Sequence, residues 1–209
     1  EDGFAVDFST LLGSAEDDDF SLITASQLHF AGLEGETQTI EVAITRDAVV
    51  EDDETFTVTL GDVSGTTDVQ REAIATGGSA TGTIIDDDTA VYTINDVTVD
   101  EAAGTLIFTV SVSNPVDIPV AIDVSYADQT ATGAPGGVGV DYDNNPDQVV
   151  FAALDTTDQL VTVAITNDNL AEVTETFLAS LSTATALGGR SVDTSDTGTG
   201  TITDNDNNP

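Results

Sequence analysis

Carboxylate side chains recur twice along this chain with the same spacing, and their type suits the binding of a metal ion. Three acids follow an alternating apolar segment in each of two places, 121 positions apart (168 − 47 = 121). They are Asp47, Glu51 and Glu54 in the first place, and Asp168, Glu172 and Glu175 in the second. Each copy later ends on a further group of acids, which is Asp86, Asp87 and Asp88, or Asp204 and Asp206. Because Ca²⁺ prefers hard oxygen ligands supplied by loops, this pattern indicates an ion site present twice.

The same residues give little support for catalysis. Glu172 and Glu175 could in principle serve as the two acids of a glycosidase, but catalytic pairs seldom recur in tandem copies. His29 is the only histidine and cysteine is absent, which leaves little for a nucleophilic triad. The glycine-rich segment 133–139 lacks the Gly-Lys-Ser/Thr ending of a phosphate-binding loop. We therefore predict that the chain is not an enzyme.

The charge of the chain limits its partners. Thirty-nine acidic residues stand against three basic ones, for a formal net charge of −36. Such a chain repels nucleic acid and anionic membranes, and no segment is long and apolar enough for direct membrane insertion. It also repels itself, so bound cations or high salt would stabilise its folded state. The absence of cysteine excludes disulfides and zinc–thiolate sites and is compatible with an extracellular location.

Alternating apolar residues predict an all-β chain of two tandem domains, over residues 1–88 and 89–209. In the second domain the alternation marks about seven strands, the number expected of an immunoglobulin-like antiparallel β-sandwich. These strands are expected at 91–94, 106–112, 120–126, 149–151, 161–165, 177–181 and 199–203. No segment shows a convincing helical period.

The first domain is expected to lack its opening strand. Its strands are predicted at 4–8, 27–30, 40–44, 56–60 and 80–85. Phe8 takes the place of Tyr126 in this alignment, so nothing corresponds to residues 91–112. Two interpretations are open. The chain is a piece of a longer array, or a strand from another chain completes the sheet as in donor-strand addition.

Four motifs, taken in order, make the second domain resemble the Calx-β domain of sodium–calcium exchangers, integrins and bacterial surface proteins. The motifs are Asp100-Glu101-Ala102-Ala103-Gly104, Asp141-Tyr142, the acidic segment 167–177 and Thr201-Ile202-Thr203-Asp204-Asn205-Asp206. The first domain repeats most of them, with Asp19-Phe20 in the place of Asp141-Tyr142. The resemblance implies an immunoglobulin-like fold whose acidic loops gather at one end and bind calcium.

Carried over residue by residue, the resemblance assigns two sets of metal ligands. The first set is Asp19, Asp47, Glu51, Glu54, Asp86, Asp87 and Asp88, with the carbonyl of Val49. The second set is Glu101, Asp141, Asp168, Glu172, Glu175, Asp204 and Asp206, with the carbonyl of Leu170. Neutral residues replace some of the family's acids, because Asn167 and Asn169 flank Asp168 and Asn205 separates the last two acids. Fewer charges imply fewer ions or an affinity in the extracellular range of roughly 10⁻⁴ to 10⁻³ M; the alternative is a pair of vestigial sites whose acids only solvate the surface.

The function implied by this resemblance is a calcium-binding structural or adhesive repeat of a large secreted or cell-surface bacterial protein. Its expected partners are calcium ions and neighbouring repeats of the same protein or adjacent chains. Asp86, Asp87 and Asp88 stand at the junction of the domains, so we expect calcium to stiffen that junction. Two alternatives remain, a subunit of an extracellular filament completed by donor-strand exchange and a regulatory calcium sensor.

Overall fold

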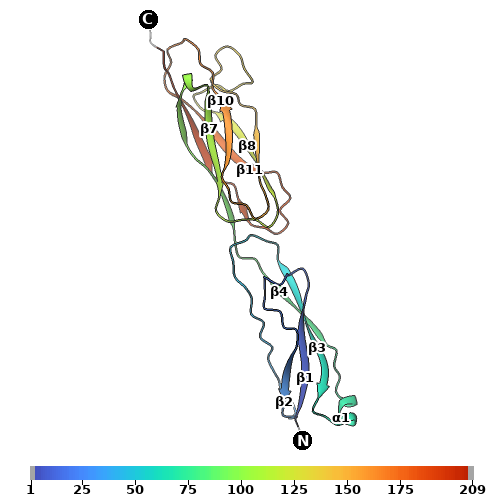
Figure 1. Ribbon diagram of the computed structural model, residues 1–209. Helices are drawn as coiled ribbons and strands as arrows, with labels where there is room; N and C mark the ends of the chain where they lie inside the picture. Colours follow the sequence, from blue (N-terminus) through green and yellow to red (C-terminus); the bar gives the residue numbers. More distant parts are fainter. Residues whose placement is uncertain (1–2, 207–209) are drawn as a thin grey trace. The chain divides into compact units, whose positions relative to one another are not determined.

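The computed structural model describes residues 3–206, apart from the side chains of residues 68–70 (Figure 1). Contacts within the chain divide it into two compact units. The first unit comprises the chain up to Asp47 together with Asp52–Asp86, and the second comprises Ala48–Glu51 and the chain from Asp87 onward. The regular elements of both units are almost all strands, which confirms the prediction of an all-β chain. Below, the first repeat denotes residues 1–88 and the second repeat residues 89–209.

The second unit is a β-sandwich of two sheets. One sheet has the strand order β10-β7-β5-β12, and β7 and β10 lie side by side (Figure 1). The other has the order β6-β13-β11-β8-β9. The strand bounds are β5 Ala90–Ile94, β6 Val97–Asp100, β7 Thr105–Val112, β8 Val120–Asp128, β9 Asp147–Phe151, β10 Gln159–Ala164, β11 Glu175–Thr183, β12 Val192–Asp193 and β13 Thr197–Thr203.

The core of this sandwich is built by every second residue of its strands. Along β8, Val120, Ile122 and Val124 are buried while the residues between them are partly exposed. Phe108 of β7 meets Phe177 of β11 edge to face, with ring centroids 5.9 Å apart. Burial of alternate apolar side chains between two sheets is the main source of stability in this architecture.

A glycine lets the central phenylalanine pack against its sheet in both repeats. A Cβ atom at Gly200 would lie 2.3 Å from the ring of Phe177, and one at Gly82 would lie 2.4 Å from the ring of Phe56. Both pairs are also directly opposed in register, Phe177 to Gly200 and Phe56 to Gly82. The chain therefore repeats this ring-on-glycine contact as well as its acids.

The first unit contains a single four-stranded sheet among the described residues, with the order β2-β1-β3-β4. The strands are β1 Phe4–Leu12, β2 Ser26–Phe30, β3 Glu54–Ser64 and β4 Ser79–Ile84, and the short helix α1 covers Asp68–Ala73. A small core forms where Phe20, from a connecting loop, stacks on Phe56 of β3 with ring centroids 4.6 Å apart. Within the described residues no strand corresponds to β5, β6 or β7, in agreement with the predicted lack of an opening strand.

Several details differ from the sequence-based expectations. The predicted strand at 40–44 does not form, and only an isolated bridge joins Ile44 to Phe20. The helix α1 and the short strands β6 and β12 were not predicted. None of the described residues forms a helix of the length and apolarity needed to cross a membrane.

The expected equivalence of Phe8 with Tyr126 is wrong. Tyr126 faces Ala179 in register, and the residue at the matching place opposite Val58 is Thr10. From this position to the candidate ligand the chain runs 9 residues in the first repeat (Thr10 to Asp19, 19 − 10 = 9) and 15 in the second (Tyr126 to Asp141, 141 − 126 = 15). The loop after this strand therefore differs in length between the repeats, which sequence spacing does not locate.

Candidate metal centre

Three clusters of carboxylates bring acidic oxygens within 4.8 Å of one another. Each cluster contains three acids from segments that lie apart in the sequence. They are Asp19, Glu51 and Glu54; Glu101, Asp204 and Asp206; and Asp141, Glu172 and Glu175. All nine were predicted as metal ligands, and the structure brings them together in groups of three.

Parallel pairing of β6 with β13 positions the cluster of Glu101, Asp204 and Asp206. Asp100 at the end of β6 lies opposite Thr203 at the end of β13, so the acids that follow each strand are neighbours. A single 3-10 turn, η1 (Glu101–Ala103), holds Glu101 in place. The Asp100 side chain caps this turn by accepting from the Ala102 N–H, and Gly104 ends it with a left-handed φ of 69°.

Two oxygens in this cluster are buried in a way that calls for a positive partner. Glu101 is only 4% exposed, and its Oε1 accepts a long hydrogen bond of 3.5 Å from the Asn205 N–H. Asp206 Oδ2 is buried without a hydrogen-bond partner. Since an unpartnered buried carboxylate oxygen is costly, a bound cation is the natural means of satisfying it.

The cluster of Asp141, Glu172 and Glu175 is positioned by the loops beside β8, β10 and β11. The Asp141 Oδ2 atom accepts from the Thr132 N–H at 2.6 Å, and the Asp141 carbonyl accepts from the Thr166 N–H at 2.9 Å. Glu175 begins β11 opposite Ile202 of β13, two residues before Asp204. This pairing places the cluster beside the one that contains Glu101.

A small cavity joins the two clusters of the second repeat. Its lining includes Glu101 and Asp204 from one cluster and Asp141, Glu172 and Glu175 from the other. The cavity has a volume of about 10 Å³. A space of this size holds about one water molecule, and therefore an ion of similar size.

The crowding of acids raises the pKa of three carboxyl groups. Burial, together with a hydrogen bond to Asp141 and the charges of Asp141 and Glu172, raises the pKa of Glu175 to about 7. Burial also raises the pKa of Glu101, and the charges of Asp204 and Asp206 add to the shift. The pKa of Glu172 rises through burial and the charges of Asp141, Asp168 and Asp204. The raised pKa of Glu175 lies near neutral pH, so a divalent cation beside this group would favour the loss of its proton.

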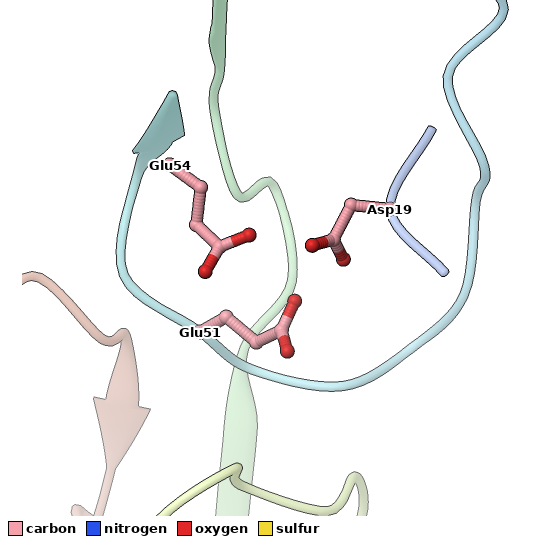
Figure 2. A group of neighbouring side chains, drawn as sticks. All are labelled: Asp19, Glu51 and Glu54. Atoms are coloured by element: carbon pink, nitrogen blue, oxygen red, sulfur yellow. The ribbon is translucent and has the colours of Figure 1, made fainter. Parts of the chain in front are cut away.

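The first repeat holds its acids with the same backbone contacts. Asp19 Oδ2 accepts from the Glu16 N–H at 2.6 Å, as Asp141 accepts from Thr132, and the Asp19 carbonyl accepts from the Thr45 N–H at 2.8 Å. Figure 2 shows the carboxylates of Asp19, Glu51 and Glu54 pointing toward a common space. The repeat in the sequence is thus a repeat of local geometry.

The donor set fits calcium. Each cluster supplies only carboxylate oxygens, without the nitrogen or sulfur ligands that zinc and copper prefer. The acids come from several loops, which suits the irregular six to eight oxygen ligands of Ca²⁺ better than the strict octahedron of Mg²⁺. The buried Asp206 Oδ2 and the raised pKa of Glu175 are both relieved by a bound cation.

Five predicted ligands lie outside the three clusters. They are Asp47, Asp86, Asp87, Asp88 and Asp168. Asp168 is still close enough for its charge to raise the pKa of Glu101 and Glu172. The Asp86 N–H donates to Asp53, an acid that was not among the predicted ligands. The roles of these five acids as ligands remain predictions.

Sequence reasoning also missed residues that support the site. Asp128 accepts from the Tyr142 hydroxyl and from the Gly133 N–H, and Thr132 donates to Asp141. Their only signal in the sequence is the position of Asp128 at the end of an alternating strand, which does not identify a role.

Comparisons with known proteins identify the family of this chain. A model of the Calx-beta domain matches residues 2–88 and again residues 91–206. No curated protein matches the chain. Among solved structures, the apo-form Calx CBD1 domain is 16% identical, with a TM-score of 0.46, 56% of this chain covered and 98% of that chain. CBD12 from CALX1.2 is 18% identical, with a TM-score of 0.41, 96% of this chain covered and 87% of that chain.

The two successive matches to the family model cover nearly the whole sequence. The chain belongs to the Calx-beta domain family.

Proposed function

We propose that this chain is a calcium-binding structural module of a larger secreted or cell-surface protein, with its better-defined ion site in the second repeat. Calx-beta domains bind calcium and are typically non-catalytic. The observation that carries the proposal is the pair of adjoining clusters around one small cavity, with Glu101 buried and Asp206 Oδ2 unpartnered. Tandem repetition and a net charge of −36 support a structural role.

The residues of the second repeat would act together on a bound ion. Glu101, Asp204 and Asp206 would hold it from one side of the cavity, and Asp141, Glu172 and Glu175 from the other. A calcium ion supplies two positive charges that offset the repulsion among these acids. The chain itself contributes the placement, because β6 and β13 end beside the start of β11. Without a cation, the repulsion among the acids would loosen the loops. A bound cation would tie the four segments that carry these acids together.

Thermal unfolding tests this function. Calcium binding to the native state should raise the unfolding temperature of chelator-treated protein, by an amount that grows with the calcium concentration. Magnesium at equal concentration should give a smaller rise, and equal ionic strength from sodium chloride controls for screening. Equal shifts with all three salts would mean that the acids respond only to ionic strength.

The finer part of the proposal concerns the junction between the repeats. Asp86, Asp87 and Asp88 are consecutive in the sequence just before β5 begins at Ala90. Calcium held by these acids would restrict motion of the chain there and stiffen an extracellular array. Small-angle scattering with calcium and with chelator should show a narrower distribution of dimensions when calcium is present. Identical distributions would refute this part and leave ion binding itself intact.

A second candidate, completion of the first repeat by a strand from another chain, is favoured by one observation. Strand β13 of the second repeat pairs with β6, whereas its counterpart β4 ends its sheet among the described residues. A free edge of this kind accepts an added strand. Light scattering across a range of protein concentrations should then show association. A constant monomer mass would exclude assembly by this chain alone.

The affinity for calcium distinguishes a regulatory sensor from a structural module. A module that works outside the cell needs a dissociation constant of roughly 10⁻⁴ to 10⁻³ M, while a sensor needs about 10⁻⁷ to 10⁻⁵ M. Neutral Asn167, Asn169 and Asn205 among the acids favour the weaker range.

A further inference from the structure

Beneath the acids of the second repeat, one carboxylate joins two loops. Asp128 Oδ1 accepts a hydrogen bond of 2.6 Å from the Tyr142 hydroxyl and another of 2.9 Å from the Gly133 N–H. Asp128 ends β8, whereas Tyr142 follows the candidate ligand Asp141. The Tyr142 side chain is fully buried. The hydrogen bond between Tyr142 and Asp128 therefore fastens the loop that carries a candidate ligand to the end of a core strand.

The ring of Tyr142 also touches the strand that carries a second candidate ligand. It stacks on Phe177 of β11, with ring centroids 4.0 Å apart and an angle of 11° between the rings. Phe177 lies two residues after Glu175, on the same face of the strand. Through this one ring, the chain beside Asp141 is packed against the chain beside Glu175.

The peptide that holds the Asp141 carboxylate is itself held by Asp128. The Thr132 N–H donates to Asp141 Oδ2, and the next N–H along the chain, that of Gly133, donates to Asp128 Oδ1. A Cβ atom at Gly133 would lie 2.5 Å from Cζ of Tyr142, so the backbone passes directly against the phenol. Loss of the Tyr142 hydroxyl would loosen Asp128, then Gly133 and Thr132, and through them Asp141.

The first repeat shows that the fold does not need this hydrogen bond. Phe20 stands in the place of Tyr142 and still stacks on Phe56, the counterpart of Phe177. Leu12 stands in the place of Asp128, because Leu12 faces Phe56 as Asp128 faces Phe177. Donor and acceptor are replaced together, while the ring stacking and the N–H contact to Asp19 are kept. The hydroxyl thus adds something specific to the second site.

We propose that Tyr142 is a positioning residue for the ion site of the second repeat, acting through Asp128 to fix the carboxylate of Asp141 next to those of Glu172 and Glu175. The proposal rests on the proposed calcium function. It also makes the two sites unequal, since Asp141 is held through this additional hydrogen bond while Asp19 is held by its backbone contacts alone. Partners of this kind, one step removed from the ion, typically change metal affinity by about 10- to 100-fold.

The chain provides a matched control for the test. Tyr126 is half-buried, packs on Phe177 as Tyr142 does, and donates to another carboxylate, Asp147, at 2.8 Å. Tyr126→Phe and Tyr142→Phe each remove one phenol–carboxylate hydrogen bond beside the same ring. Asp147 belongs to none of the carboxylate clusters described above, so only the change at Tyr142 should reach the ion site.

The experiment is a calorimetric titration of calcium into the full chain. All variants carry Glu54→Gln, which weakens the first site. Tyr142→Phe should bind calcium about tenfold more weakly at the second site, whereas Tyr126→Phe should stay within about twofold of the parent. Asp128→Ala should match Tyr142→Phe, and Asp128→Asn, which keeps an acceptor oxygen, should recover most of the affinity. Unfolding temperatures without calcium should fall to a similar extent in the two tyrosine variants, which separates stability from positioning.

Each outcome has one meaning. Affinity of Tyr142→Phe within twofold of the parent, or an equal loss in Tyr126→Phe, overturns the positioning role and leaves calcium binding standing. A parent that takes up no calcium at the second site overturns the proposed function and the positioning role with it.

Discussion

Glu175, at the start of β11, shares a hydrogen bond with Asp141, in the loop between β8 and β9, although both residues are acids. Such a bond requires that one of the two carboxyl groups carries a proton. Burial and the neighbouring charges raise the pKa of Glu175 to about 7, so the metal-free site keeps this proton near neutral pH. The contact between these residues therefore makes the charge of the ion site depend on pH.

Calcium binding should therefore release a proton. A cation placed among Asp141, Glu172 and Glu175 favours their ionised forms, so calcium and the proton compete. We expect calcium to bind more weakly as the pH falls from about 8 to 6. Titrations in buffers of different ionisation enthalpy should reveal proton release at pH 7, and its absence together with a pH-independent affinity would contradict the competition.

Stability of the metal-free protein should change with pH in a defined direction. The pKa of Glu175 is about 7 in the folded protein against an ordinary value of 4.5, so the folded state binds more protons between these values. The stabilising contribution of this group is complete below about pH 4.5 and is lost as the pH rises through about 7. Glu175→Gln cannot ionise at this position. With chelator present, the unfolding temperature of this variant relative to that of the parent should increase as the pH rises from 5 to 8. A constant difference across this range would argue against the raised pKa.

Glu101 should matter more than other acids for ion binding. It is 4% exposed and lies with Asp204 and Asp206 beside the cavity. Glu101→Gln removes one buried charge, so we expect at least about tenfold weaker calcium binding. The metal-free variant should also be no less stable than the parent, because a buried ionised group is costly.

Asp158→Asn is the control for Glu101→Gln, because it removes the same charge from an exposed acid outside the three clusters. If both variants lose affinity equally, the effect comes from the net charge of the chain and the cluster has no special role.

Gly133→Ala should destabilise the second repeat. The added Cβ would lie 2.5 Å from Cζ of Tyr142 and 2.8 Å from Cβ of Asn144, which leaves it no space without movement of a buried ring. We expect a loss of roughly 1–3 kcal/mol in the free energy of unfolding, the range for overpacking. Gly78→Ala is the comparison, since its nearest atom would be 4.0 Å away. Denaturant unfolding of both variants measures the difference, and equal stabilities would show that the loop yields at little cost.

Alternating apolar residues predicted most strands correctly because a buried sheet face imposes that alternation directly. The segment 40–44 shows the limit of this reasoning. Ile40, Val42 and Ile44 alternate like a strand, but the counterpart β10 is held by pairing with β7, for instance Val161 with Phe108. Among the described residues the first repeat has no counterpart of β7. Strand formation depends on a partner, which a local pattern does not report.

The candidate site was predictable to the extent that acids mark it. The nine clustered acids were all predicted, through repetition and family resemblance together. Which of the predicted acids form clusters was not predictable, because Asp86, Asp87 and Asp88 look as suitable in the sequence as Asp204 and Asp206 do. The supporting contacts of Asp128 and Tyr142 depend on strand register, which sets Asp128 opposite Phe177 and Leu12 opposite Phe56 and which the spacing of the motifs does not report.

The most direct test of the central claim is calorimetric titration of calcium into chelator-treated protein, comparing the parent with Glu101→Gln combined with Glu175→Gln. We expect a binding heat in the parent with a dissociation constant of roughly 10⁻⁴ to 10⁻³ M, and loss of the heat of the second repeat in the double variant. A parent that gives no heat and no rise in unfolding temperature, or a double variant that binds calcium as the parent does, would contradict it.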